Sequence, residues 1–242
     1  MKIFIAGTST NKEIVQRNLP KFVLESYFYF REWQIPLIKS SEMFLLDSGA
    51  YTFMNSSKHK KLDFDSYLKN YISFINKYDI KYFFELDIDD VVGYEKVLEY
   101  RKILEDETGK KCIPVWHITR GKDEYINLCE NYDYIAIGGM TNKKVKSKIQ
   151  KYYRWFEDIS IKNKTKVHIL GSTDRKTLSS RFYSVDSTAW LNSCRGTHIS
   201  KFINGKIKYI QRENARIKNL KIAHDYNLKE WIKLQRYLEL KG

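Results

Sequence analysis

The chain has 242 residues, 43% of them hydrophobic, which suits one large domain with a substantial core. Its 43 Lys and Arg against 29 Asp and Glu give a net charge of +14, which favours a polyanionic partner such as nucleic acid, although a merely solvated basic surface has the same composition. The scattered Cys112, Cys129 and Cys194 argue against a zinc knuckle or disulfide framework, and no apolar run suits a signal peptide or membrane span, so we expect a soluble, cytoplasmic protein.

Strand-length apolar runs rich in Ile, Val, Phe and Tyr occur along the whole chain. They lie at Ile3–Ala6, Phe44–Leu46, Tyr82–Leu86, Ile113–Trp116, Tyr134–Ile137, Val167–Leu170 and Tyr183–Val185. The segment Ile199–Ile210 has room for an eighth strand.

Helical patterns separate these runs. Apolar residues from Phe64 to Ile75 follow a 3.6-residue period, and Asp63 is suited to cap that helix. Further helices are predicted around 94–104, 145–156, 178–182 and 228–238.

Strands that alternate with helices over the whole chain indicate a parallel sheet covered by helices. The number of strands favours a single (β/α)8 barrel over residues 1–242 rather than an open sheet. Neither a GxGxxG nor a GxxxxGK[ST] motif is present, which argues against dinucleotide and P-loop sites.

Polar residues stand where the predicted strands end, which in a barrel is the catalytic face. They are Asp47 in FLLDSGAYTF, Asp87 and Asp89 in ELDID, His117 in IPVWHI, Gly138 and Gly139 in YIAIGGM, Gly171 in VHILGST and Asp186 in YSVDSTAW. Each has a local alternative: the aspartates can cap turns or helices, the histidine can be a core residue, and the glycines can be simple turns. Together they predict three carboxylate-bearing strand ends and a histidine on one face.

The ordered set of LLDSGAYTF, ELDID, YIAIGGM, VHILGST and YSVDSTAW resembles the tRNA-guanine transglycosylase superfamily over about residues 3–190. Enzymes of that family are (β/α)8 barrels that exchange a guanine base for a 7-deazaguanine. The resemblance implies that Asp186 is the nucleophile and that Asp47 is the general acid and base. The exchange reaction that the resemblance implies needs no cofactor and no metal ion.

The base would be bound by the remaining strand-end residues. The resemblance implies that Asp87, with Asp89 as the alternative, reads the Watson–Crick edge of guanine, and that Gly138, Gly139 and Gly171 lie against the base. We expect His117 to contact its carbonyl edge and Tyr51 to stack on its ring. Basic residues near the same face are expected to hold phosphates, although each can equally be a solvated surface residue; they are Lys58, Lys60, Lys61, Lys143, Lys144 and Arg195.

The chain also departs from the tRNA enzymes. It has no Cys-rich zinc site, Ala50 follows Gly49 where the family has a second glycine, and His117 stands where the family usually has Gln. With its short length, these differences resemble the compact relatives of phages and bacterial islands that place 7-deazaguanines in DNA. We therefore expect DNA rather than tRNA as the partner, a free 7-deazaguanine base as the second substrate, the host cytoplasm as the location if a phage encodes the chain, and room for a helper protein that opens the duplex.

Three other functions fit the same residues. The first is the same exchange on tRNA or another RNA, and the second is an N-glycoside hydrolase in which water replaces the incoming base. The third is a barrel that binds nucleic acid without catalysis, against which the presence of both Asp47 and Asp186 argues. The sequence does not indicate the particular deazaguanine, the target sequence or the oligomeric state.

Overall fold

The computed structural model describes residues 1–49, 63–192, 198–211 and 219–241. Its main feature is one sheet of eight parallel strands, in which helical segments connect each strand to the next. The strands are β1 Lys2–Ala6, β2 Phe22–Ser26, β3 Met43–Asp47, β4 Tyr82–Phe83, β5 Val115–Trp116, β6 Tyr134–Ile137, β7 Lys166–Ile169 and β8 Ser184–Ser187.

The strand order closes the sheet on itself. The hydrogen-bonded order is β4-β3-β2-β1-β8-β7-β6-β5, so β1 lies between β2 and β8 in the middle. The two end strands meet through a parallel bridge between Phe84 and Ile113, with Glu85 N–H donating to Ile113 O at 3.1 Å. This arrangement confirms the predicted (β/α)8 barrel.

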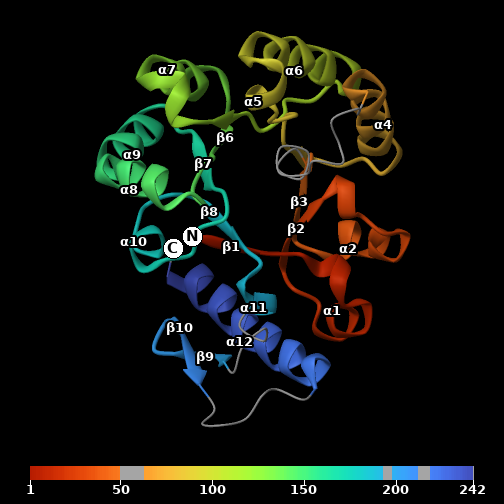
Figure 1. The fold of residues 1–242 in the computed structure, drawn as a ribbon, viewed down its shortest axis with the longest axis vertical. Helices are drawn as coiled ribbons and strands as arrows, with labels where there is room; N and C mark the ends of the chain where they lie inside the picture. Colours follow the sequence, from red (N-terminus) through yellow and green to blue (C-terminus); the bar gives the residue numbers. More distant parts are fainter. Residues whose placement is uncertain (50–62, 193–197, 212–218, 242) are drawn as a thin grey trace.

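Helices surround the strands, as Figure 1 shows. They are α1 Lys12–Asn18, α2 Ile35–Ser40, α4 Phe64–Lys77, α5 Asp89–Val92, α6 Tyr94–Thr108, α7 Gly121–Asn131, α8 Lys143–Lys151, α9 Tyr153–Lys162, α10 Arg175–Leu178, α11 Ala189–Asn192 and α12 Leu220–Lys241. Short 3-10 turns occupy Thr8–Thr10, Tyr27–Tyr29, Glu32–Gln34 and Ile118–Arg120. In the described part of the chain, no helix combines the length and apolarity needed to cross a membrane.

The strands bury both of their faces, because one lines the barrel interior and the other lies under the helices. In β1, Phe4 belongs to the interior cluster, whereas Ile3 and Ile5 belong to the cluster that includes α12. Leu45 of β3 likewise faces the interior. This two-residue alternation is the ordinary geometry of a strand, and it decides which strand-end side chains enter the barrel mouth.

The predicted helix after β3 is confirmed as α4. The carboxylate of Asp63 caps it by accepting hydrogen bonds from the backbone N–H groups of Asp65 and Ser66, both at 3.1 Å. Its buried Tyr71 donates a hydroxyl hydrogen bond to the barrel backbone, with Leu46 O at 3.1 Å and Phe84 O at 3.0 Å. The helix is thereby attached to β3 and β4 next to the expected catalytic face.

Four expectations about elements were wrong in detail. Residues 199–210 do not supply a barrel strand, because β9 His198–Ile203 and β10 Lys206–Gln211 pair as an antiparallel hairpin beside α12 (Figure 1). The missing strand is β2, whose apolar run is only Phe22–Leu24 before Glu25. The helix expected over 145–156 is two helices, α8 and α9, divided at Tyr152. The short helix expected over 178–182 is α10, which ends at Leu178.

Candidate active site at the barrel mouth

The predicted strand-end residues converge because parallel strands all present their carboxyl ends at one end of the barrel. The alternation of side chains then selects those that enter the interior. Met43 and Leu45 line the interior, so Asp47, two residues further along β3, continues on the same side. In β8, Ser184 and Asp186 share a face in the same way.

Asp47 is a carboxyl group with an unusual proton affinity. Gly49, whose φ of +83° favours glycine, turns its N–H back to donate to Asp47 Oδ2 at 3.0 Å. Burial raises the pKa of Asp47 to about 7, against the opposing effect of that hydrogen bond, and the negative charges of Asp186 and Asp87 raise it further. Near neutral pH such a group can both give and take a proton.

Asp186 is fixed from one side. It is 9% exposed, and its Oδ1 accepts the backbone N–H of Gly171 at 2.6 Å. His168 Nε2 lies 3.2 Å from the same oxygen. Both contacts are on Oδ1, which leaves Oδ2 as the oxygen without a hydrogen bond from these groups.

Asp87 and His117, both expected to contact a base, contact each other. His117 Nε2 lies 2.9 Å from Asp87 Oδ1 and 2.7 Å from Oδ2. Burial disfavours the charged imidazole, but the hydrogen bonds and charge of Asp87 outweigh it and raise the pKa of His117. Asp87 and His117 remain partly accessible, with side chains 16% and 21% exposed.

Arg120, which the sequence analysis did not single out, contacts the carboxylate of Asp87 from the buried side of the site. Its guanidinium is 2% exposed and reaches Asp87 Oδ1 at 3.3 Å and Asp89 Oδ2 at 3.1 Å. It also contacts the fully buried Glu85, with Nη1 3.1 Å from Oε1. Its central carbon lies 4.3 Å from the ring centroid of Tyr94, a cation–π contact. Asp89 is therefore held by Arg120 rather than being free.

Asp87, Asp89 and His117 also have the chemistry of metal ligands. One ligand atom from each lies within 4.8 Å of the others. Arg120 already contacts both carboxylates, so a divalent cation would have to displace a buried guanidinium from them. Among the described residues, Cys112 and Cys129 are buried free thiols, and their spacing in the sequence does not match the cysteine cluster of a zinc site.

Gly138 and Gly139 lie directly beside His117. A Cβ atom on Gly138 would stand 2.4 Å from His117 Cε1, so only glycine leaves room for the imidazole in this position. Gly138 N–H is used within the barrel, donating to Trp116 O at 2.9 Å. The structure thus places these glycines against His117, and their contact with a base stays a prediction.

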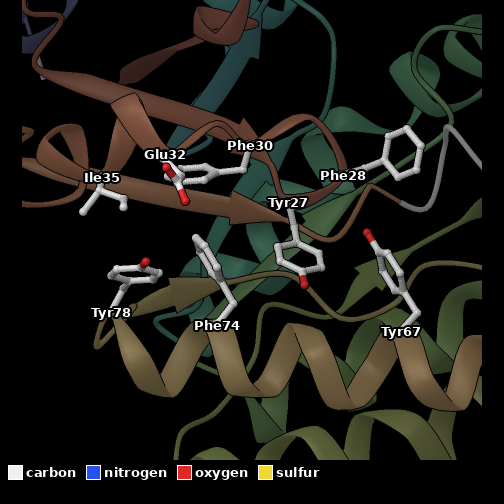
Figure 2. A pocket seen from close by; sticks show the side chains of 8 residues that line it. All are labelled: Tyr27, Phe28, Phe30, Glu32, Ile35, Tyr67, Phe74 and Tyr78. Atoms are coloured by element: carbon white, nitrogen blue, oxygen red, sulfur yellow. The ribbon is translucent and has the colours of Figure 1, made fainter.

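Next to Asp47, a groove runs between the segment that follows β2 and helix α4 (Figure 2). Its volume is about 460 Å³. It is lined by Tyr27, Phe28, Phe30, Glu32, Ile35, Tyr67, Phe74 and Tyr78. Tyr67 marks the end nearest the mouth, because its hydroxyl donates to Ser48 O at 2.7 Å. The Ser48 hydroxyl is buried and makes no hydrogen bond to the described residues.

The expected phosphate-binding residues are only partly described. Lys143 and Lys144 are exposed in the first turn of α8, where the side chain of Asn142 caps the helix after β6. Arg175 and Lys176 are also exposed, at the start of α10 after β7, and were not predicted. The expected contacts of Tyr51, Lys58, Lys60, Lys61 and Arg195 lie outside the described residues.

A second residue that the sequence analysis missed is Glu25, at the end of β2. It is 1% exposed and accepts the backbone N–H of Thr8, so it holds the turn after β1. Burial raises the pKa of Glu25. The available signal was the pattern FVLES, which has the same apolar-run, carboxylate and serine order as FLLDS.

No known family model matches this chain, and no curated protein sequence matches it. A function for the chain is therefore inferred from the geometry of the barrel mouth and from the motif resemblance.

Proposed function

We propose that the chain is a nucleic-acid guanine transglycosylase that replaces guanine in DNA by a 7-deazaguanine through a covalent Asp186–sugar intermediate. The observation that carries the proposal is the pair of carboxyl groups at one barrel mouth in contrasting environments. Asp47 has a pKa of about 7, and Asp186 is held by donors on a single oxygen. Displacement at a sugar carbon with retention uses one carboxylate as nucleophile and another group as acid and base.

The first half of the reaction breaks the C1′–N9 bond of the target nucleotide. An oxygen of Asp186 attacks C1′ and forms an ester bond to the sugar, while the electron pair of the broken bond passes to N9. The protonated carboxyl of Asp47 gives N9 its proton, so guanine leaves as a neutral base. A pKa of about 7 makes that protonated form available at neutral pH.

The second half reverses these steps with a different base. The incoming 7-deazaguanine gives its N9 proton to the Asp47 carboxylate, and N9 attacks C1′. The C1′–O bond to Asp186 breaks, its electron pair returns to the carboxylate, and Asp47 is again protonated. Protons and charges balance over one cycle, so no cofactor is needed.

Recognition of the base is assigned to Asp87 and His117. A carboxylate can accept about four hydrogen bonds, so Asp87 keeps acceptor capacity for the N–H groups of guanine beside its contacts to His117 and Arg120. Only partial exposure of Asp87 and His117 is needed, because a flipped base enters from the mouth. The net charge of +14 and the exposed Lys143 and Lys144 suit a polyanionic strand.

The test is incorporation of labelled guanine into three substrates: single-stranded DNA, duplex DNA and tRNA. We expect label in DNA, and a protein–DNA adduct that survives denaturation when no free base is supplied. Asp186→Asn should abolish both, by at least about 10⁴-fold, because an amide is a poor nucleophile. Asp47→Asn should slow exchange by about 10²–10⁴-fold.

The alternatives give different outcomes in the same assay. Label in tRNA alone would replace DNA by RNA as the substrate. Guanine released without label uptake would identify an N-glycoside hydrolase. Salt-sensitive binding with neither release nor uptake on any substrate would overturn the enzymatic proposal in favour of a binding protein.

A further inference from the structure

We propose that His168 is a positioning residue: with Gly171 it holds Oδ1 of Asp186 and so makes Oδ2 the oxygen that attacks the sugar. This inference rests on the proposed function for its chemical meaning. The hydrogen-bonded chain that links Tyr134, Ser184, His168 and Asp186 is present in the barrel interior whatever reaction the protein catalyses.

His168 lies inside the barrel and has no contact with solvent. It is 0% exposed, and its ring packs edge-on against Phe4 and Phe84, with centroids 5.8 Å and 5.7 Å away. Its Nε2 lies 3.2 Å from Asp186 Oδ1. A buried imidazole enclosed by aromatic rings has few alternative positions, so it can hold a carboxylate in one orientation.

The other ring nitrogen is also engaged. His168 Nδ1 lies 2.8 Å from Ser184 Oγ, which lies 2.6 Å from the hydroxyl of Tyr134. As the proposed nucleophile, the Asp186 carboxylate can only accept, so the ring hydrogen of His168 is assigned to Nε2, which faces it. Nδ1 of the neutral ring then accepts from the Ser184 hydroxyl, which leaves the Tyr134 hydroxyl to donate to Ser184. The chain Tyr134–Ser184–His168–Asp186 thus runs in one direction.

This direction fixes the two oxygens of Asp186 in different roles. Oδ1 accepts from both His168 and the Gly171 N–H group, so its lone pairs are directed into the barrel wall. Oδ2 receives neither of these bonds and keeps its electron pairs for C1′. Rotation of the carboxylate would break two hydrogen bonds at a buried position, which is costly.

The experiment compares His168→Leu, which removes the donor, with His168→Gln, which keeps an N–H donor at a similar reach. The rate of covalent adduct formation is measured at saturating single-stranded DNA, together with the Kd for that DNA. We expect His168→Leu to slow adduct formation by about 10²–10³-fold with little change in Kd, as for loss of one preorganised donor. His168→Gln should recover the rate to within about tenfold of wild type.

A merely structural role predicts something else. If the Leu and Gln variants, both folded by circular dichroism, are equally slow, or if the Leu variant reacts at the wild-type rate, the positioning role is overturned. Should His168→Leu fail to fold, Ser184→Ala provides the second variant. It removes only the partner of Nδ1 and should slow adduct formation about tenfold.

A spectroscopic measurement separates this inference from the proposed function. In protein with ¹⁵N-labelled histidine, we expect the His168 hydrogen on Nε2, and we expect that resonance to move in Asp186→Asn. A hydrogen on Nδ1, or no response to Asp186→Asn, overturns the inference even if base exchange is observed. If the wild-type protein exchanges no base, the proposed function fails while the resonance still decides whether His168 holds Asp186.

Discussion

The carboxylates at the barrel mouth form two pairs with different environments. Asp47 at the end of β3 and Asp186 in β8 accept hydrogen bonds from backbone N–H groups, and Asp186 also from a buried histidine. Asp87 and Asp89, in the segment after β4, are ion-paired with Arg120, and Asp87 also with His117. Among the described residues, a buried guanidinium contacts the second pair and not the first.

This difference explains how one residue type can serve two purposes. Without an ion pair, the proton affinity of Asp47 responds to burial and to neighbouring negative charge, and its pKa rises to about 7. Asp87 and Asp89 instead contact the buried guanidinium of Arg120. Proton transfer is therefore assigned to Asp47, and recognition of the base to Asp87.

Removal of Arg120 is the most disruptive way to test the comparison. Arg120→Met leaves Asp87 and Asp89 buried or half-buried without their shared cation, and takes one of two arginines from Glu85. Breaking a buried ion pair in this way costs about 3–5 kcal/mol of unfolding free energy. Urea denaturation at pH 7 measures it.

The matched control for that variant is Arg154→Met. The side chain of Arg154 is 93% exposed, and its Nε lies 4.0 Å from Asp158 Oδ2, which is a long distance for an ion pair. Its loss should therefore leave the urea midpoint unchanged. An equal loss of stability in the two variants would mean that Asp87 and Asp89 are not held by Arg120.

The next test neutralises one carboxylate of each pair, Asp47 and Asp87. Because the pKa of Asp47 is higher in the folded protein than in an unfolded chain, folding binds a proton there. The associated stability is present in full below about pH 4 and is lost as the pH rises towards about 7. Asp47→Asn should therefore stabilise the protein by about 2–4 kcal/mol at pH 8, and the gain should vanish near pH 4.

Asp87→Asn should have the opposite sign at pH 8. It removes a charge that pairs with Arg120 and His117, so the protein should lose stability. Urea unfolding of both variants between about pH 4 and pH 8 measures the contrast. Two variants that change stability in the same direction would show that Asp47 and Asp87 lie in electrostatically similar environments.

The sequence predicted the barrel and its strand-end residues for reasons that are local. Apolar runs, helical periods and the two-residue alternation are properties of short segments, so Asp47, His117 and Asp186 could be placed on one face. The strand β2 was missed because its apolar run is brief and ends in Glu25, a residue that is unusual in a barrel interior.

The partners of those residues could not be predicted in the same way. His168 in β7 meets Asp186 in the neighbouring strand β8, and Arg120 meets Asp87 across 33 positions of the chain. Each partnership depends on the register and tilt of separate elements, which a single sequence does not specify. In VHILGST, the only hint was a histidine among residues that otherwise suit a buried strand.

The smallest expected effect concerns exposed lysines, in contrast to the buried Arg120. Arg120 is buried and serves the fold, whereas Lys143 and Lys144 are exposed at the start of α8 and are free to meet phosphates. If each neutralises one phosphate, Lys143→Gln with Lys144→Gln should lower the magnitude of the slope of log K against log salt on single-stranded DNA by about 1.4. Fluorescence anisotropy of single-stranded DNA between about 50 and 200 mM salt measures that slope.

The control for the lysine variant is Lys81→Gln with Lys162→Gln. These lysines are exposed before β4 and at the end of α9, at the opposite end of the barrel from the mouth. Both double variants lose two positive charges from the same net charge of +14, so a change in overall charge alone would affect them equally. A reduced slope in the α8 variant only would place the nucleic acid over the mouth, because counterions are released where phosphates are contacted. Equal slopes would mean that the charge attracts DNA without directing it to Asp47 and Asp186.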